Sequence, residues 1–216
     1  MADPNADYVN MSVEEYTHRW DERWKKNYTP WDMGEPAPGL IHLFKQDTFG
    51  DSGTALVPGC GTGYEVNWIS SYKNWSAVGI DISEKAIQVA SSLAGERATF
   101  LVRDFFALDQ EFDLAFDHLF LCALQPKQRL DWAKKYGSII KPSGKLVTYI
   151  WPINAEKKDG IYICVILGPP FALSLDLCKE LLQENFTLEY AEKPVFTYEK
   201  RVNGEHQELI AIWSRK

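Results

Sequence analysis

The stretch that decides the predicted fold is residues 54–64, Thr-Ala-Leu-Val-Pro-Gly-Cys-Gly-Thr-Gly-Tyr. Its apolar run, Ala55 to Val57, is typical of a fully buried strand, and Pro58 ends that strand. Three alternating glycines follow, and a helix is predicted over residues 64–71. A strand, a glycine-rich turn and a helix can form a cradle for a nucleoside cofactor, because glycines let a ligand approach the bare backbone.

A second apolar run ends in Asp81, twenty residues after Gly61, where a nucleotide-binding fold has the carboxylate that binds a ribose hydroxyl. Two cofactors, a dinucleotide and S-adenosylmethionine, are considered for this glycine turn. A dinucleotide fingerprint, G-x-G-x-x-G, has its third glycine where this chain has Tyr64. The observed G-x-G-x-G spacing favours S-adenosylmethionine, which has no pyrophosphate to seat. An ordinary glycine-rich turn is the remaining interpretation.

The composition argues against several classes of protein. A length of 216 residues fits one domain, and a net charge of −7 without a basic block argues against nucleic-acid binding. The four cysteines are widely spaced, which favours reduced thiols in a cytoplasmic protein and gives a metal site little support. The N-terminus does not resemble a signal peptide, and no apolar run reaches the length of a membrane span.

Strands and helices are predicted to alternate along the chain. Residues 1–11 are expected to form a disordered tail, and a capping box at Ser12 predicts a helix to about Lys26. The remaining pattern predicts a helix at 39–47, strands at 54–58, 76–81, 98–103, 112–117 and 145–151, helices at 63–71, 83–94 and 126–140, and a last helix from the cap Ser174 to about 184.

The last part of the chain predicts an edge to the sheet. Residues 153–170 are expected to form an irregular insert. The extended runs 187–199 and 206–214 flank Asn203-Gly204, which is a strong hairpin signal. Alternating strands and helices give a mostly parallel sheet, so we expect an α/β fold with an antiparallel hairpin at one edge.

Three tryptophans lie close together near the N-terminus. Trp20 and Trp24 share one face of the first predicted helix, and Trp31 lies in a proline-punctuated loop. Aromatic faces stabilise soft cations such as a sulfonium, so these rings could cover the cofactor. The alternative is that the rings pack the helix onto the core. The two interpretations are equally supported for Trp20 and Trp24, whereas the loop position of Trp31 favours a role in covering the cofactor.

Further candidates follow the third and fourth predicted strands. Asp104 could accept the adenine amino group while Phe105 covers the base, although a helix cap beside a core Phe explains both equally well. His118 ends the fourth strand, where it could position or deprotonate a nucleophile; a satisfied polar side chain is the alternative. Cys122 lies in an apolar run, which favours inert burial.

These motifs together resemble the thiopurine S-methyltransferase superfamily, and most of all its branch of thiol, thiocyanate and halide methyltransferases. The match covers roughly residues 14–186. The motifs that carry it are Trp20-x3-Trp24, Thr29-Pro30-Trp31-Asp32-x-Gly34, Leu56-Val57-Pro58-Gly59-Cys60-Gly61-x-Gly63, Gly79-Ile80-Asp81-Ile82-Ser83, Asp104-Phe105-Phe106, Phe112-Asp113-Leu114, Asp117-x3-Leu121-Cys122-Ala123-Leu124 and Gly168-Pro169-Pro170-Phe171.

The resemblance implies a Rossmann-like, class I S-adenosylmethionine-dependent methyltransferase with a seven-stranded sheet. It implies an N-terminal helical lid over residues 12–48 and a core over 54–216, within one domain from residue 12. It also implies the site residues. Those assigned to the cofactor are Trp20, Trp24, Trp31, Gly59, Gly61, Asp81, Ile82, Asp104 and Phe105. Phe171 is assigned to the substrate pocket, and both it and His118 stand where relatives often have Tyr.

The sequence therefore predicts an S-methyltransferase for small thiols, with S-adenosylmethionine as cofactor and His118 as the catalytic residue. The partners expected are a small thiol or anion, and the chain is expected to be a monomer. Three alternatives stay open: a halide or thiocyanate methyltransferase, an NAD-dependent oxidoreductase and a non-catalytic adenosine-binding module.

Overall fold

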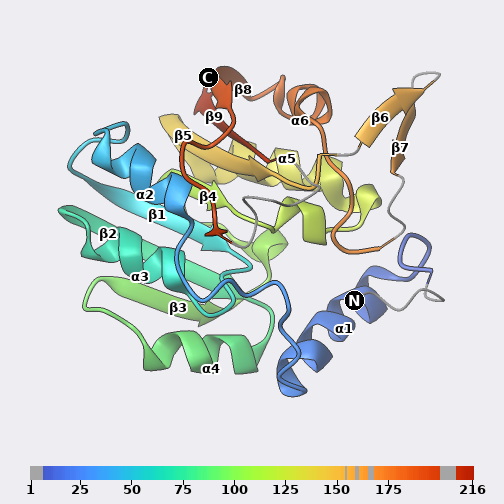
Figure 1. The fold of residues 1–216 in the computed structure, drawn as a ribbon, viewed down its shortest axis with the longest axis horizontal. Coiled ribbons are helices and arrows are strands. Elements are labelled where there is room, and N and C mark those ends of the chain that lie inside the picture. The colour runs from blue at the N-terminus through green and yellow to red at the C-terminus, as the bar shows by residue number, and fades with distance from the viewer. Residues whose placement is uncertain (1–6, 154, 159–160, 165–167, 200–207) are drawn as a thin grey trace.

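The structure is a computed structural model that describes residues 7–153, 155–158, 161–164, 168–199 and 208–216. Its main sheet has seven strands in the order β3-β2-β1-β4-β5-β9-β8 (Figure 1). These strands are β1 (Ser52–Pro58), β2 (Asn74–Asp81), β3 (Ala98–Val102), β4 (Phe112–Asp117), β5 (Ile140–Ile150), β8 (Phe186–Glu192) and β9 (Leu209–Arg215).

The first five strands of the sheet are parallel, whereas β9 pairs antiparallel with both β5 and β8. The predicted fold class and the antiparallel edge are therefore confirmed. Asn203-Gly204, the predicted turn of that hairpin, lies outside the described residues.

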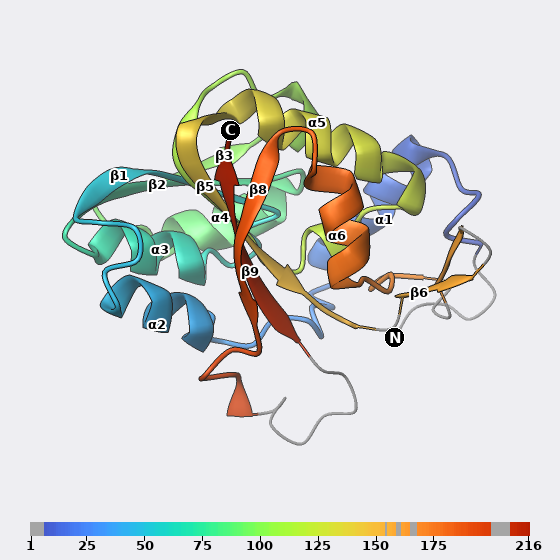
Figure 2. The ribbon, with the colours of Figure 1, turned by 90° about the horizontal axis from the view of Figure 1, so that it is seen from above.

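Helices cover both faces of the sheet, as the view from above shows (Figure 2). Apolar side chains of α2 and α3 pack on one face, and those of α5 and α6 pack on the other. The helices are α1 (Val13–Lys25), α2 (Pro38–Lys45), α3 (Tyr64–Ser71), α4 (Glu84–Ser92), α5 (Arg129–Ile139) and α6 (Leu175–Leu182). In the described part of the chain, no helix combines the length and the apolar character needed to cross a bilayer.

Side-chain caps fix the predicted starts of three helices. The hydroxyl oxygens of Ser12, Ser83 and Ser174 accept hydrogen bonds from backbone N–H groups in the first turns of α1, α4 and α6. Such caps satisfy donors that have no partner within the helix. The polar cap signals therefore located these three helix starts correctly.

The structure differs from the predicted elements in several places. Strand β8 ends at Glu192, whereas the predicted extended run continues to residue 199. Strand β5 begins at Ile140, five residues before the predicted Lys145. The insert predicted as irregular contains an antiparallel pair, β6 (Ala155–Lys158) and β7 (Ile161–Cys164). Tyr8, within the tail predicted to be disordered, is buried, and its carbonyl accepts a hydrogen bond from the Gln125 side chain at 2.7 Å.

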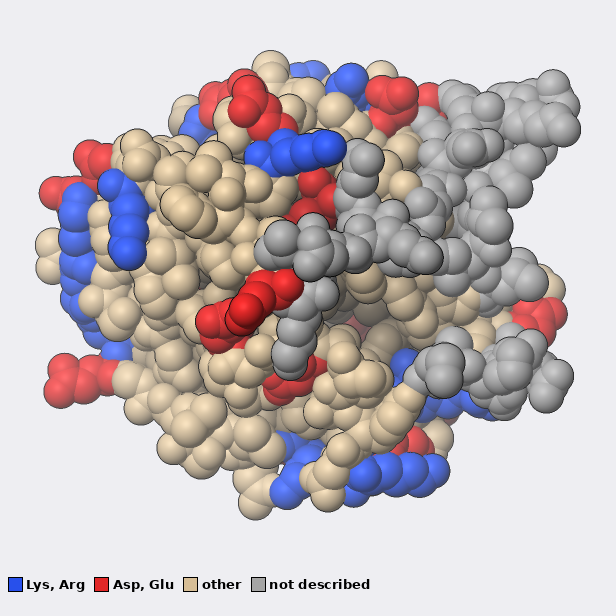
Figure 3. Space-filling model, viewed as in Figure 1, with Lys and Arg blue, Asp and Glu red and all other residues tan. Residues whose placement is uncertain are grey.

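Acidic and basic side chains are mixed on the face of the molecule shown in Figure 3. There the described Lys and Arg side chains form separate groups among Asp and Glu rather than one continuous patch. Proteins that bind nucleic acid concentrate basic residues on one face, so this face does not have their typical charge pattern.

Candidate functional site

A cavity of about 660 Å³ lies at the carboxyl ends of the parallel strands, beneath helix α1. Ligands of open α/β sheets bind at this edge, and the volume falls within the usual range for small-molecule sites. Its walls come from α1 and the loop after it, the glycine turn, the ends of β2 and β3, the segment after β4, Trp151 and Pro169-Pro170.

The glycine turn forms the floor of the cavity. Gly59, Gly61 and Gly63 have φ angles of +57°, +53° and +82°, a region that L side chains rarely adopt. A Cβ atom at Gly59 would also lie 2.7 Å from the ring of Phe120. The first two glycines line the cavity, so the bare backbone is exposed to a ligand there.

Asp81 places a buried carboxylate at the end of β2, in the wall of the cavity. Its two oxygens accept hydrogen bonds from the backbone N–H of Gly61 at 3.1 Å and of Ser83 at 3.0 Å. Burial raises the pKa of Asp81, and these N–H donors oppose the rise. The structure thus joins the predicted ribose acid to the predicted glycine turn.

The three tryptophans form one aromatic wall. The ring of Trp31 meets those of Trp20 and Trp24 edge-on, with centroids 5.1 and 6.2 Å apart. All three line the cavity, and a Cβ atom added at Gly61 would lie 3.2 Å from the Trp24 ring. The structure therefore brings the N-terminal rings to the same cavity as Asp81.

Two polar contacts that the sequence did not reveal connect this wall to the core. The Ser83 hydroxyl donates to Asp21 of α1 at 2.8 Å, and the Thr62 hydroxyl donates to Asp32. Each contact ties the N-terminal segment to a turn that borders the cavity. The residues are more than 25 positions apart, so periodicity gave no signal for either contact.

Asp104, Phe105 and Ile82 also line the cavity. The Asp104 carboxylate caps a 3₁₀ helix (Phe105–Ala107) by accepting the N–H of Phe106 at 3.0 Å. The Phe105 ring is buried and packs edge-on against Phe120. Asp104 therefore caps a helix and Phe105 packs in the core, as the alternative interpretation predicts. Both residues also line the cavity.

His118 lies elsewhere. It is not among the residues that line the cavity, and its Nδ1 lies 3.1 Å from Glu65 Oε1. Its ring stacks on Tyr198 and meets Tyr149 edge-on. The structure therefore does not bring the predicted catalytic histidine together with the other predicted site residues.

The side chains of Glu65 and His118 form a buried pair. Burial raises the pKa of Glu65, but the hydrogen bond and charge of His118 outweigh that effect and leave the pKa below its ordinary value. The same carboxylate oxygen accepts the N–H of Ala37 at 3.2 Å. Glu65 therefore links the start of α3, the end of β4 and the segment that leads into α2.

Phe171 is fully buried behind the cavity rather than in its lining. Its ring contacts that of Tyr16, a lining residue of α1, at a centroid distance of 6.2 Å. The Tyr16 hydroxyl donates to the carbonyl of Ala123 at 2.6 Å. Sequence reasoning missed Tyr16, although it lies four residues before Trp20 on the same helical face.

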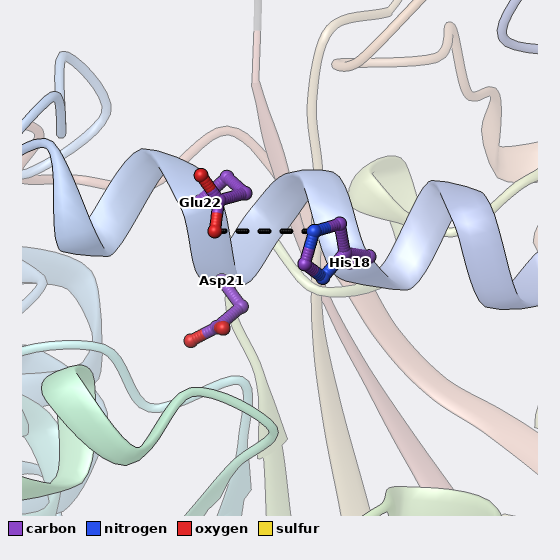
Figure 4. A group of neighbouring side chains, drawn as sticks. All are labelled: His18, Asp21 and Glu22. Carbon is purple, nitrogen blue, oxygen red and sulfur yellow. Dashed lines mark ion pairs between the residues drawn. The ribbon is translucent and has the colours of Figure 1, made fainter.

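Three side chains of α1, His18, Asp21 and Glu22, lie close enough together to suggest a metal site (Figure 4). They already have protein partners: His18 pairs with Glu22 at 3.9 Å, and Asp21 accepts Lys25 at 2.6 Å and the Ser83 hydroxyl. The Lys25 hydrogen bond lowers the pKa of Asp21. These partners account for the cluster without an ion.

Solved structures with a similar architecture include a methyltransferase. A Burkholderia thailandensis 1,6-didemethyltoxoflavin-N1-methyltransferase with bound S-adenosylhomocysteine has a TM-score of 0.73 and 16% identity, covering 100% of this chain and 98% of that one. A structure described by the conversion of a disulfide bond into a thioacetal group during echinomycin biosynthesis has a TM-score of 0.71 and 20% identity, covering 93% of each chain. These likenesses confirm the Rossmann-like, class I fold.

Curated relatives are more similar in sequence. The "Probable thiol methyltransferase 2" of Arabidopsis thaliana is 36% identical over 182 residues, which cover 81% of this chain and 76% of the relative. The "Thiocyanate methyltransferase 1" of Brassica oleracea is 35% identical over 184 residues, which cover 82% and 76%.

A sequence model of one family spans almost the whole chain. That family is described as "Thiopurine S-methyltransferase (TPMT)", and its model matches residues 15–212. The resemblance inferred from the motifs is confirmed, and with it S-adenosylmethionine as the cofactor. The chain belongs to the thiopurine S-methyltransferase family.

Proposed function

We propose that this protein transfers the methyl group of S-adenosylmethionine to the sulfur atom of a small thiol. The observation that carries the proposal is the cavity itself, which a buried carboxylate, a bare glycine turn and three tryptophans line together. The names of the similar plant proteins support sulfur as the methyl acceptor.

The residues present fit this cofactor. Asp81 is an anionic acceptor in the cavity wall, suited to the ribose diol, and Asp104 is suited to the adenine amino group. The tryptophan rings offer π faces to a sulfonium, each contributing about 0.5–2 kcal/mol. When bound, the cofactor supplies a methyl group on a positively charged sulfur.

The protein contributes placement. Its walls can hold a nucleophile near the cofactor and exclude water, and such placement lowers a barrier by up to about 7–11 kcal/mol in well-oriented model reactions. His118 is predicted to position or deprotonate the nucleophile, but its side chain pairs with Glu65 and does not line the cavity, which supports neither direct role. In this proposal His118 acts indirectly, by fixing the start of α3 beside the glycine turn.

Turnover is the direct test of the proposed function. Purified protein and S-adenosylmethionine should be incubated with bisulfide, aryl thiols and dithiols, and with thiocyanate and iodide as competing classes, while S-adenosylhomocysteine release is measured. Methylation of thiols supports the proposal. Turnover of the anions alone would favour a halide or thiocyanate methyltransferase, which the name of the Brassica relative supports as second candidate.

Two other classes predict different outcomes. An NAD-dependent oxidoreductase would bind NAD in a calorimetric titration, whereas Tyr64 at the third glycine position argues against that cofactor. A non-catalytic adenosine-binding module would bind S-adenosylhomocysteine but methylate none of the acceptors. A single domain from residue 12, a monomeric state and a cytoplasmic location stay predictions from the sequence.

Replacing Ser83 with Ala should reduce both stability and cofactor affinity, because Ser83 caps α4 and also contacts Asp21 of α1. Loss of the cap should cost about 0.5–2 kcal/mol of unfolding free energy. Ser174→Ala is the matched control, since Ser174 caps α6 and does not line the cavity. Urea unfolding should respond to both variants, but calorimetry of S-adenosylhomocysteine should respond only to Ser83→Ala. Equal affinities would show that the Asp21 contact does not position the lid.

A further inference from the structure

The charged side chains of the cavity are unevenly distributed. Asp81, Arg103 and Asp104 lie together at the ends of β2 and β3. On the other wall, which consists of α1, residues 119–124, Gln128, Trp151 and Pro169-Pro170, the lining residues include one charged side chain, Arg23. A ligand bound against this second wall therefore meets apolar and aromatic groups and one guanidinium.

Arg23 has no carboxylate partner within ion-pair distance among the described residues. Its guanidinium lies over the ring of Trp20, 4.7 Å from the ring centroid. Burial raises the pKa of Tyr16, and a hydrogen bond with Trp20 and the charge of Arg23 oppose that rise. Tyr16 in turn binds Ala123 on the segment after β4. Arg23 and Trp20 therefore belong to the cavity wall that α1 shares with this segment.

The wall also has no obvious general base. Its titratable side chains besides Arg23 are Tyr16, Tyr28 and Cys122, and no His, Lys or Glu lines the described cavity. The two lining carboxylates already accept backbone N–H groups at the far wall. A nucleophile here gains more from a fixed positive charge than from a proton acceptor.

We propose that Arg23 is a specificity-determining residue that binds the negative charge of the nucleophile, so that the site selects soft anions and thiols in their thiolate form. The inference deepens the proposed function and depends on it. A thiol releases its proton to solvent, and the guanidinium stabilises the resulting thiolate, as a neighbouring Arg does for cysteine thiolates. The anionic sulfur then attacks the methyl carbon of the cofactor, the bond from that carbon to the sulfonium sulfur breaks, and S-adenosylhomocysteine leaves with the electron pair. No proton acceptor in the protein is needed.

The test compares two small sulfur nucleophiles that differ in charge, thiocyanate and neutral thiourea. Arg23→Gln should raise KM for thiocyanate by about 10–100-fold, the scale of a lost hydrogen bond between charged groups. The constant for thiourea, KM if it is a substrate or the inhibition constant if it is an inhibitor, should change by much less. Arg23→Lys keeps the charge and should recover most of the loss. Arg19→Gln is the control, because Arg19 lies one turn earlier on α1 and does not line the cavity.

Two further measurements show whether Arg23 binds the anionic nucleophile or the carboxylate of the cofactor. Calorimetry of S-adenosylhomocysteine should give the same affinity for Arg23→Gln and the original protein, and weaker binding would assign Arg23 to the cofactor carboxylate and overturn the inference. Added salt should slow thiocyanate methylation in the original protein more than in Arg23→Gln. If Arg23→Gln changes KM equally for thiocyanate and thiourea, or changes KM for neither, the inference about Arg23 is also overturned. If the original protein methylates no acceptor, the proposed function itself fails.

Discussion

Replacing Asp81 with Ala is expected to weaken binding of S-adenosylhomocysteine by about 10–150-fold, which corresponds to the 1.5–3 kcal/mol of a hydrogen bond to a charged group. The variant removes an anionic acceptor from the cavity wall and leaves the N–H groups of Gly61 and Ser83 without their partner. The glycine turn then loses one of its hydrogen bonds to β2, while the N–H of Cys60 still donates to the carbonyl of Ile80, and the loss of affinity should be at the upper end. Calorimetry measures the affinity directly.

A folded control separates the site from general destabilisation. Asp109→Ala removes an exposed carboxylate a few residues after the Asp104 cap and outside the cavity lining, so cofactor affinity should stay unchanged. Both variants should first be checked for folding by circular dichroism. A folded Asp81→Ala protein with unchanged affinity would remove Asp81 from the cofactor site.

The pH dependence of cofactor affinity gives a second measurement on the same carboxylate. Because burial raises the pKa of Asp81 above 3.8, its anionic form is lost at a higher pH than that of an ordinary Asp. The anionic carboxylate is a stronger acceptor than the protonated carboxyl, so affinity should be full above this raised pKa and should fall as pH decreases through it. Calorimetry across mildly acidic pH should show this decrease in the original protein and none in Asp81→Asn.

Local patterns predicted the part of the fold that holds the cofactor. The apolar run that became β1, the glycine turn and the acid at the end of β2 are close together in sequence, and each has a backbone requirement that only certain residues meet. Positive φ angles at Gly59, Gly61 and Gly63 explain why glycines stand there. Such short-range constraints can be inferred from one sequence.

The start of β5 and the insert were less predictable, because strand pairing decided them. Lys141-Pro142-Ser143-Gly144 reads as a turn, and Ser143 does have a positive φ of 65°. Pairing nevertheless continues from Ile140 opposite Phe112, with an irregular register before Leu114. The start of such an interrupted strand is decided by its pairing with the neighbouring strand, and the strand propensities of its own residues do not predict it.

The side chains at the end of β4 show why the placement of His118 could not be predicted. Neighbouring residues of a strand point to opposite faces of the sheet, and no local pattern says which face borders the cavity. The Asp117 carboxylate accepts hydrogen bonds from Trp132 and Tyr136 of α5. His118, the next residue, instead pairs with Glu65 of α3. The sequence shows that a polar pair ends the strand, but the partners come from distant helices.

Replacing His118 with Ala is expected to destabilise the protein by about 3–5 kcal/mol, the usual effect of removing one partner from a buried charged pair. The variant leaves the buried Glu65 carboxylate without its His118 partner, while the N–H of Ala37 still donates to it. Because the folded pKa of Glu65 is lowered, the stability that the pair contributes is present above pH 4.5 and is lost as pH falls through the folded pKa. Urea unfolding at pH 7 and at low pH should show this difference.

Glu65→Gln in the His118→Ala background is the matched test, because it removes the stranded charge while keeping the shape of the side chain. It should recover a large part of the lost stability. If His118 acts through Glu65 and the glycine turn, kcat/KM should fall by similar factors for an alkyl thiol and for thiocyanate, since neither depends on a proton acceptor at residue 118. A stable His118→Ala protein that loses about 10²–10⁴-fold on thiols alone would instead identify His118 as the general base. The nucleophile would then reach the His118 ring, and the site would extend beyond the cavity that Arg23 and the tryptophans line.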